Sequence, residues 1–146
     1  MLVRTALELA IIAKATQRAK PESLSILSKI LKIQAACLKA NDKMGFHQTD
    51  EDFHAAIVEI SGFTGVWPLI LQAKTQIDRY RQLTLPFEGR MHDVFEEHLK
   101  VFAAIKTGDP KKAQATMQDH LDHVLPLLEE ARQIKPDYFM PSRKKD

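Results

Sequence analysis

The sequence lacks most of the features that mark secreted, β-rich or membrane-spanning proteins. Cys37 is the single cysteine among 146 residues, so an internal disulfide is excluded and a reducing compartment is expected. Only five glycines occur, and no Asn-Gly or Asp-Gly pair marks a β-hairpin turn. The apolar N-terminal stretch is interrupted by Arg4, Glu8 and Lys14, and it falls short of the roughly 20 apolar residues of a membrane span. A soluble, cytoplasmic protein is therefore expected.

An excess of charge of one sign is also missing. The chain has 21 basic and 19 acidic residues, which leaves a net charge of +2. So weak a net charge gives no indication of nucleic-acid binding by this chain. The composition is otherwise that of an ordinary soluble domain, with 45% hydrophobic and 27% charged residues, and 146 residues are enough for one buried core.

What is present is a helical spacing of apolar residues, repeated along nearly the whole chain. Proline fits the start of two helices, at Pro21 and at Asp109-Pro110, and glycine fits the end of two, at Gly62 and Gly108. Because the connections are short, we predict an all-α fold, a single antiparallel bundle of about six helices with a metal or ligand site in its core. The expected helices cover about residues 2–19, 21–40, 50–62, 65–83, 87–106 and 110 onward.

Three local features complete this prediction. Residues 41–48 are expected to form a loop, with Thr49 as the N-cap of the helix that follows. Pro126 is expected to kink the last helix near Val124. We expect residues 1–135 to form the helical domain and residues 136–146 to form a polar C-terminal tail.

Polar residues interrupt the apolar faces of three expected helices. Asp50 and His54 are four positions apart and therefore lie side by side on one helix surface. His98 and His120 occupy the middle of two apolar stripes, one on each of the last two helices. The stripes read Met91, Phe95, His98, Phe102, Ile105 and Ala113, Met117, His120, Val124.

These four residues have the composition of a metal site. Helical bundles build such sites from side chains on facing helices. Imidazole and carboxylate suit a divalent ion, zinc first and also nickel, manganese or iron, and an octahedral ion would keep two positions open for a bidentate acid. The alternative is structural, because a lone histidine on a core face usually fills a polar niche and Asp50 in a first helical turn complements the helix dipole. The residues alone leave both interpretations open.

Other polar residues rank below this set. His47 is expected in the loop, His123 lies towards the polar side of its helix, and His92 is placed where it could face the cavity. Glu97 neighbours His98 but is expected to point away from it, so no separate base is evident beside the four residues. A metalloenzyme that uses the open coordination positions is therefore the second hypothesis, behind a binding function.

The same residues carry a resemblance to a known family. Asp50-Glu51-Asp52-Phe53-His54 resembles the D-x-x-F-H motif of the FCD domain, the effector-binding C-terminal domain of FadR-type GntR transcription regulators. Arg4-Thr5-Ala6-Leu7-Glu8 is similar to the R-x-x-L-E of that domain's first helix. The resemblance is collinear from about residue 3 to residue 130. Its later motifs correspond to Glu97-His98, Ala103-Ala104-Ile105, Gly108-Asp109, Ala113, Met117 and His120-Leu121.

The resemblance implies which residues bind the metal and which class of molecule is sensed. Metal-binding members of the family use residues that correspond to Asp50, His54, His98 and His120. Members respond to organic acids such as lactate, citrate or sugar acids, often bound at the metal. A small carboxylate effector is therefore implied, and the full regulator is expected to be a homodimer.

Three arginines are candidates for binding this acid. The first-helix arginine of the family is similar to Arg4, which is expected to pair with an effector carboxylate through its fork of donors. Arg79 and Arg81 are weaker candidates for the same role. The alternative for all three is solvated surface charge.

The chain departs from the family in two respects. Ser61-Gly62 is followed by Phe63, where the family usually has asparagine, and this change could alter the polarity of the pocket. Family members also carry an N-terminal winged helix that reads DNA, whereas this sequence starts at the first helix of the FCD domain. DNA is thus expected as a partner only through a winged-helix domain absent from this chain, and no membrane partner is expected.

Overall fold

The computed structural model describes residues 1–84, 89–124, 126, 129 and 133, without the side chains of residue 76 and residues 79–84. Within these residues the elements are helical, and no strand is present. The all-α prediction is confirmed. The elements are α1 Leu2–Arg18, α2 Pro21–Lys39, α3 Lys43–Ser61, the short 3-10 helix η1 Thr64–Val66, α4 Trp67–Thr84, α5 Arg90–Lys106 and α6 Pro110–Asp122.

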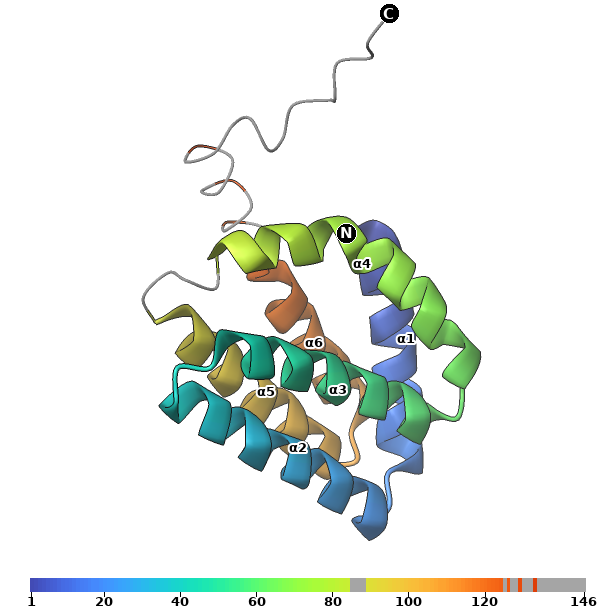
Figure 1. Ribbon diagram of the computed structural model, residues 1–146. Helices are drawn as coiled ribbons and strands as arrows, with labels where there is room; N and C mark the ends of the chain where they lie inside the picture. Colours follow the sequence, from blue (N-terminus) through green and yellow to red (C-terminus); the bar gives the residue numbers. More distant parts are fainter. Residues whose placement is uncertain (85–88, 125, 127–128, 130–132, 134–146) are drawn as a thin grey trace, which may run out of the picture.

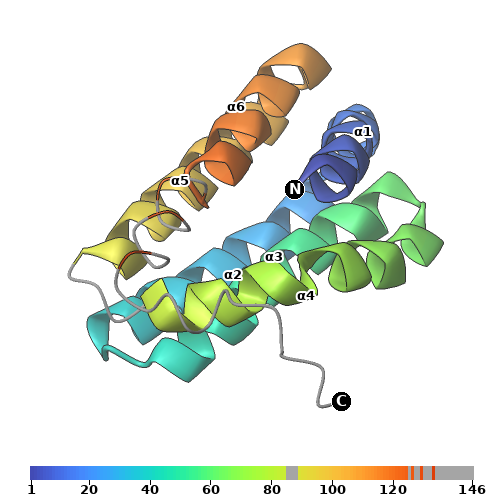
Figure 2. The ribbon, with the colours of Figure 1, turned by 90° about the horizontal axis from the view of Figure 1, so that it is seen from above.

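The helices surround one interior (Figure 1). α2 packs on α3 and α5, α5 packs on α6, and α1 packs on both α3 and α6. α4 contacts α1. In the view from above, α4 runs in about the same direction as α3 (Figure 2). None of the described helices is both long and apolar enough to span a bilayer.

The start of α3 differs from the sequence prediction. The helix begins at Lys43 and not near Asp50, because Asp42 is its N-cap and accepts a hydrogen bond from the Gly45 amide at 3.0 Å. A side chain at residue 45 would collide with the Asp42 carboxylate, so glycine permits the close approach of this cap. Thr49 is not the cap, since its hydroxyl donates to the Phe46 carbonyl within the helix.

Several other helix ends were predicted correctly. Gly62 ends α3 with a φ of 78°, a left-handed conformation that favours glycine. Asp109 caps α6, with Pro110 at its first position. α4 starts two residues later than expected, at Trp67, because η1 precedes it. α6 ends at Asp122, before the kink expected near Val124, and residues 125, 127 and 128 around Pro126 lie outside the described residues. Residues 136–146 lie outside the described residues, as do the four before Gly89.

The core lies where the helices meet. Fully buried apolar side chains line it, and the predicted stripe of α6 is buried at every position. The predicted stripe of α5 is only partly right, because Phe95 and Phe102 are half-buried while Val94, Glu97 and Val101 face inward. α5 packs against both α2 and α6, so a wider face of this helix is buried than one narrow stripe.

Candidate metal centre

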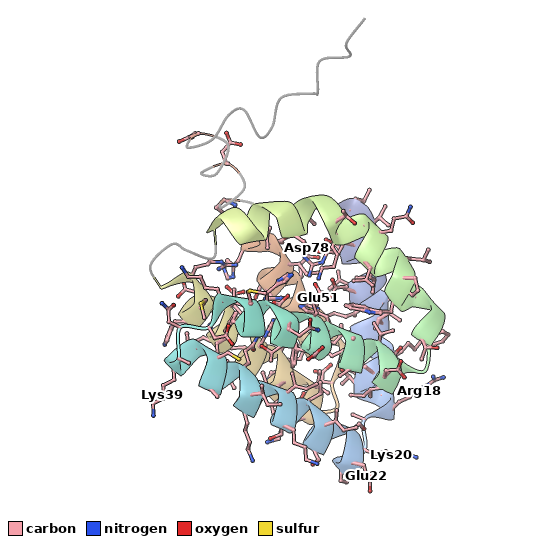
Figure 3. All side chains as sticks on the ribbon, viewed as in Figure 1. Arg18, Lys20, Glu22, Lys39, Glu51 and Asp78 are labelled. Carbon is pink, nitrogen blue, oxygen red and sulfur yellow. The ribbon has the colours of Figure 1, made fainter. Side chains whose placement is uncertain are left out.

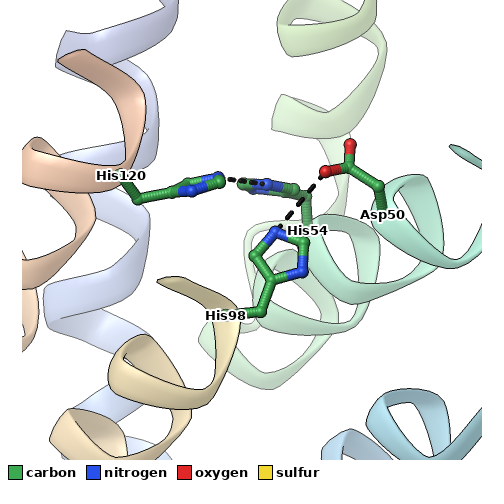
Figure 4. Close-up of side chains that lie close together, drawn as sticks. All are labelled: Asp50, His54, His98 and His120. Carbon is green, nitrogen blue, oxygen red and sulfur yellow. Dashed lines mark hydrogen bonds and ion pairs between the residues drawn. The ribbon is translucent and has the colours of Figure 1, made fainter. Parts of the chain in front are cut away.

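The four predicted ligands lie together in the interior of the bundle (Figure 4). Asp50 and His54 come from α3, His98 from α5 and His120 from α6. None is more than 2% exposed, and one potential ligand atom from each lies within 4.8 Å of the others. His54 Nε2 is 3.2 Å from His120 Nε2, and His98 Nε2 is 3.4 Å from Asp50 Oδ1.

Local sequence features explain why these side chains converge. One helical turn separates Asp50 from His54, so both point from the same side of α3. The Asp109 cap starts α6 directly after α5, and the two helices pack together with the His98 and His120 ring centroids 4.8 Å apart. Phe53 stacks on the His98 ring at a centroid distance of 4.5 Å and restricts that ring's orientation.

Each of the three imidazole rings has an oxygen atom next to its Nδ1. Since carboxylate and amide oxygens only accept hydrogen bonds, each Nδ1 carries a proton and donates it. In a neutral ring, Nε2 is then the atom with the free lone pair. The pairs are His54 Nδ1 with Glu8 Oε2 at 2.5 Å, His120 Nδ1 with Glu97 Oε2 at 2.8 Å, and His98 Nδ1 with Gln34 Oε1 at 2.8 Å.

This arrangement fits a bound cation. The Nε2 lone pairs of neutral His54 and His120 face each other at 3.2 Å and repel, so a cation or a single shared proton between them lowers the energy. Histidines that bind metals almost always donate their other ring N–H to a carboxylate, carbonyl or water. Three Nε2 atoms and the Asp50 carboxylate are a donor set that suits a divalent transition metal.

Glu8 was not among the residues singled out from the sequence, although it ends the R-x-x-L-E motif. Its Oε2 accepts from His54, and its Oε1 accepts from Arg4 Nε at 2.6 Å. Burial raises the pKa of Glu8, but the charges and hydrogen bonds of His54 and Arg4 outweigh burial and hold this pKa well below its ordinary value. The carboxylate is therefore ionised between two donors.

Arg4 reaches the same region from α1. Its side chain is 1% exposed, so the solvated-surface alternative for this arginine is wrong. Nε is used by Glu8, whereas Nη1 and Nη2 are buried and have no hydrogen-bond partner among the described residues. A buried donor without a partner costs about 1–3 kcal/mol, so an acceptor placed against these atoms would stabilise the folded chain.

Glu97 contradicts its predicted orientation, because it is buried at 8% exposure and contacts the site. Besides His120, its carboxylate lies 3.0 Å from His123 Nδ1 and 3.7 Å from Arg90 Nη1. Burial raises the pKa of Glu97. The hydrogen bond and charge of His120 and the charges of Arg90 and His123 lower this pKa by more than burial raises it, so it lies below its ordinary value. Glu97 and His120 also line a cavity of about 270 Å³ between α5 and α6.

The remaining candidates are placed elsewhere. His92 is exposed, so it does not face the core, and His47 lies within α3 and not in a loop. The side chains of Arg79 and Arg81 lie outside what the structure describes. The Phe63 ring is 45% exposed, with the Arg18 guanidinium 5.2 Å from its centroid, so this departure from the family pattern is not part of the four-residue cluster.

His47, Asp50 and Glu51 form a second group of potential metal ligands, but the Glu51 carboxylate already pairs with the ammonium of Lys74. Glu51 pairs with the ammonium of Lys74, a residue only 1% exposed, and this ammonium is also 3.4 Å from Asp78. Glu51 and Asp78 lie between α3 and α4, whereas Lys39 extends outward (Figure 3). The four-residue cluster is therefore the better metal candidate.

Comparisons with known proteins agree on one family. The family model described as FCD domain matches residues 1–123. The HTH-type transcriptional repressor RspR of Escherichia coli K12 is 23% identical over 137 residues, which are 94% of this chain and 60% of RspR. The HTH-type transcriptional repressor NanR of Klebsiella aerogenes is 30% identical over 128 residues, 84% of this chain and 47% of NanR.

The fold is also similar to a solved structure. Escherichia coli McbR/YncC superposes with a TM-score of 0.78 at 17% identity, over 88% of this chain and 62% of that protein. At this identity the likeness concerns the fold alone. The chain spans less than two thirds of the length of each of these three proteins.

Proposed function

The chain belongs to the FCD domain family of effector-binding domains in GntR-family transcription regulators, and we propose that it senses a small organic acid through a divalent metal ion. Asp50, His54, His98 and His120 would hold the ion. The observation that carries this proposal is the Nδ1 pairing of all three imidazoles, because it directs three Nε2 lone pairs and one carboxylate into the same volume.

Zinc is the first candidate for the ion, with nickel, manganese and iron as alternatives. Imidazole nitrogen binds all four metals, and a single carboxylate does not separate them. When bound, the ion supplies a Lewis acid that attracts a carboxylate. The residues of the chain do the rest: they exclude water from the site and fix the ring orientations through Glu8, Glu97 and Gln34.

Arg4 is the proposed second anchor of the acid. Its Nη1 and Nη2 atoms form a fork that matches the two oxygens of a carboxylate, and both lack a protein partner among the described residues. A small acid that contacts this fork would restore two buried hydrogen bonds. Arg79 and Arg81 remain weaker candidates for the same role.

The regulatory role is proposed from the relatives. RspR and NanR are named transcriptional repressors, and a domain of this family would bias a DNA-binding partner by shifting between two packing states. We propose that DNA is reached through a winged-helix domain and that the complete regulator is a homodimer. An enzyme is disfavoured, because Glu8 and Glu97, the carboxylates closest to the histidines, are both committed to imidazole N–H groups.

Metal analysis of purified protein tests the site. Wild type is expected to contain about one ion per chain, whereas Asp50→Ala and His98→Ala lose it. His92→Ala is the matched control, since this exposed histidine should leave the metal content unchanged. Equal metal content in all four proteins contradicts the site and leaves the histidines with a structural role.

Calorimetric titration of the metal-loaded protein tests the sensor. We expect heat from at least one acid in a panel of hydroxy and dicarboxylic acids, such as lactate, malate, citrate and gluconate, and no heat with Arg4→Ala. If no acid in the panel gives heat while the protein holds its metal, the sensing role is contradicted but the metal site is not.

A further inference from the structure

The carboxylate of Glu8 contacts both parts of the proposed binding site: Arg4, which would bind the acid, and His54, which would bind the metal. Glu8 Oε1 accepts from Arg4 Nε at 2.6 Å, and Glu8 Oε2 accepts from His54 Nδ1 at 2.5 Å. All three side chains are at most 5% exposed, so water does not screen them. Arg4 and His54 therefore compete for the negative charge of the same group.

This competition has a definite direction. With Arg4 unoccupied by an acid, its full positive charge draws electron density from Glu8 and weakens the hydrogen bond that Glu8 accepts from His54. An acid carboxylate on Nη1 and Nη2 neutralises part of that charge, so Glu8 becomes a stronger acceptor for His54 Nδ1. A stronger acceptor at the outer nitrogen makes Nε2 a more basic metal ligand.

We propose that Glu8 is a positioning residue that couples the two sites, so that an acid on Arg4 tightens metal binding at His54. The proposal rests on the function proposed above and adds a regulatory link to it. By thermodynamic reciprocity the metal tightens acid binding by the same factor. The acid needs only a carboxylate for this effect and no second group that reaches the ion.

The chain contains its own control for this link. Glu97 plays the same part for His120 that Glu8 plays for His54, with a hydrogen bond of 2.8 Å to Nδ1. However, Glu97 pairs with Arg90 and His123 and not with Arg4. Loss of Glu97 should therefore weaken metal binding without changing the effect of an acid.

The experiment is a zinc titration against a competing chromophoric chelator, with and without a saturating acid. Two acids serve as probes: lactate, and propionate, which lacks the hydroxyl needed to chelate. Free zinc is corrected for complexes that the acid forms in solution. In wild type we expect each acid to lower the zinc Kd by about fivefold or more, the usual lower range for coupled sites.

Two glutamate variants separate coupling from simple loss of affinity. Glu97→Gln should bind zinc about 10–100-fold more weakly and keep the wild-type effect of both acids. Glu8→Gln should also bind zinc more weakly, but the acids should no longer change its zinc Kd. Arg4 and His54 donate to different oxygens of Glu8, and an amide places an NH2 donor at one of these two positions, where it faces another donor.

Arg4→Lys provides a second test in case the Glu8→Gln variant, which changes a buried residue, does not fold. Lysine keeps a positive charge near Glu8 but lacks the fork, so neither acid should change the zinc Kd that this variant shows without acid. The inference is overturned if Glu8→Gln or Arg4→Lys responds to the acids as wild type does, or if wild type binds zinc and neither acid changes its Kd. Failure of wild type to bind zinc would instead overturn the proposed function itself.

Discussion

Glu97 Oε2 lies 2.8 Å from His120 Nδ1, and this buried hydrogen bond ties α5 to α6 beside the proposed metal ligands. The other oxygen of this carboxylate lies 3.0 Å from His123 Nδ1. One side chain on α5 thus orients the ligand on the neighbouring helix. Its removal is the most direct test of whether ring orientation matters for metal affinity.

We expect Glu97→Ala to weaken zinc binding by about 10–100-fold, because His120 loses the acceptor that fixes its tautomer and orientation. Competition titration with a zinc indicator measures the change. Glu96→Ala is the control, since its exposed side chain should leave the affinity unchanged. Equal affinities for the two variants would show that the Glu97 contact is irrelevant to the metal.

Removal of the metal should lower thermal stability. An ion that binds only the folded state stabilises it by RT ln(1 + [L]/Kd), about 2.7 kcal/mol when the free ion is at 100 times Kd. Differential scanning calorimetry with and without EDTA should therefore give a lower Tm in EDTA. His54→Ala should have the same Tm with and without EDTA. If EDTA does not change the Tm of wild type, metal binding is contradicted.

The metal-free protein should lose stability in acid. Glu8 and Glu97 have pKa values held below the ordinary 4.5, so they favour the folded state when ionised. This contribution is present above about pH 4.5 and is lost as the pH falls towards the folded-state values. Urea unfolding from about pH 6 to about pH 3 should show a falling free energy of unfolding.

A variant identifies the source of that pH dependence. Glu8→Gln should be less stable at neutral pH and should have a flatter profile below pH 4.5, since the lowered pKa is gone. Glu22→Gln, an exposed first-turn residue of α2, should keep the wild-type slope. A slope that is unchanged in the Glu8 variant would assign the acid sensitivity to other groups.

Phe53 supports both the core and the site. It is 0% exposed and stacks on His98 with ring planes 23° apart. Phe53→Ala should cost about 3–5 kcal/mol in the free energy of unfolding, because it opens a cavity in the core. Phe63→Ala should cost less than about 1 kcal/mol, as this residue is 45% exposed, with the Arg18 guanidinium 5.2 Å from its ring centroid. Chemical denaturation of both variants measures these two losses. Similar losses of unfolding free energy would contradict the burial of Phe53 in the core.

The sequence was sufficient to predict that Asp50, His54, His98 and His120 lie inside the bundle, because the pattern that singles them out is local. Asp50 and His54 share one face by spacing, and His98 and His120 stand where apolar residues are expected. Their supporting groups were missed because they depend on packing between helices. Glu8 reaches His54 across 46 positions, and Gln34 reaches His98 across 64. Spacing within one helix carries no information on such pairs.

Two helix errors have related physical causes. α3 starts at Lys43 because a side-chain cap at Asp42 competes successfully with the later cap predicted at Thr49. The inward orientation of Glu97 was missed because α5 is covered by neighbours on two sides. A periodicity argument identifies the centre of a buried face, but the width of that face depends on which helices pack against it.

His54 and His120, whose Nε2 atoms meet at 3.2 Å, are 66 positions apart in the chain. An ion held jointly by them would act as a reversible cross-link that closes about half of the described chain into a loop. Much of its stabilising effect then comes from restricting the unfolded chain, and this effect grows slowly with loop length. Metal occupancy should therefore influence how fast the whole domain unfolds and how long it resists proteolysis.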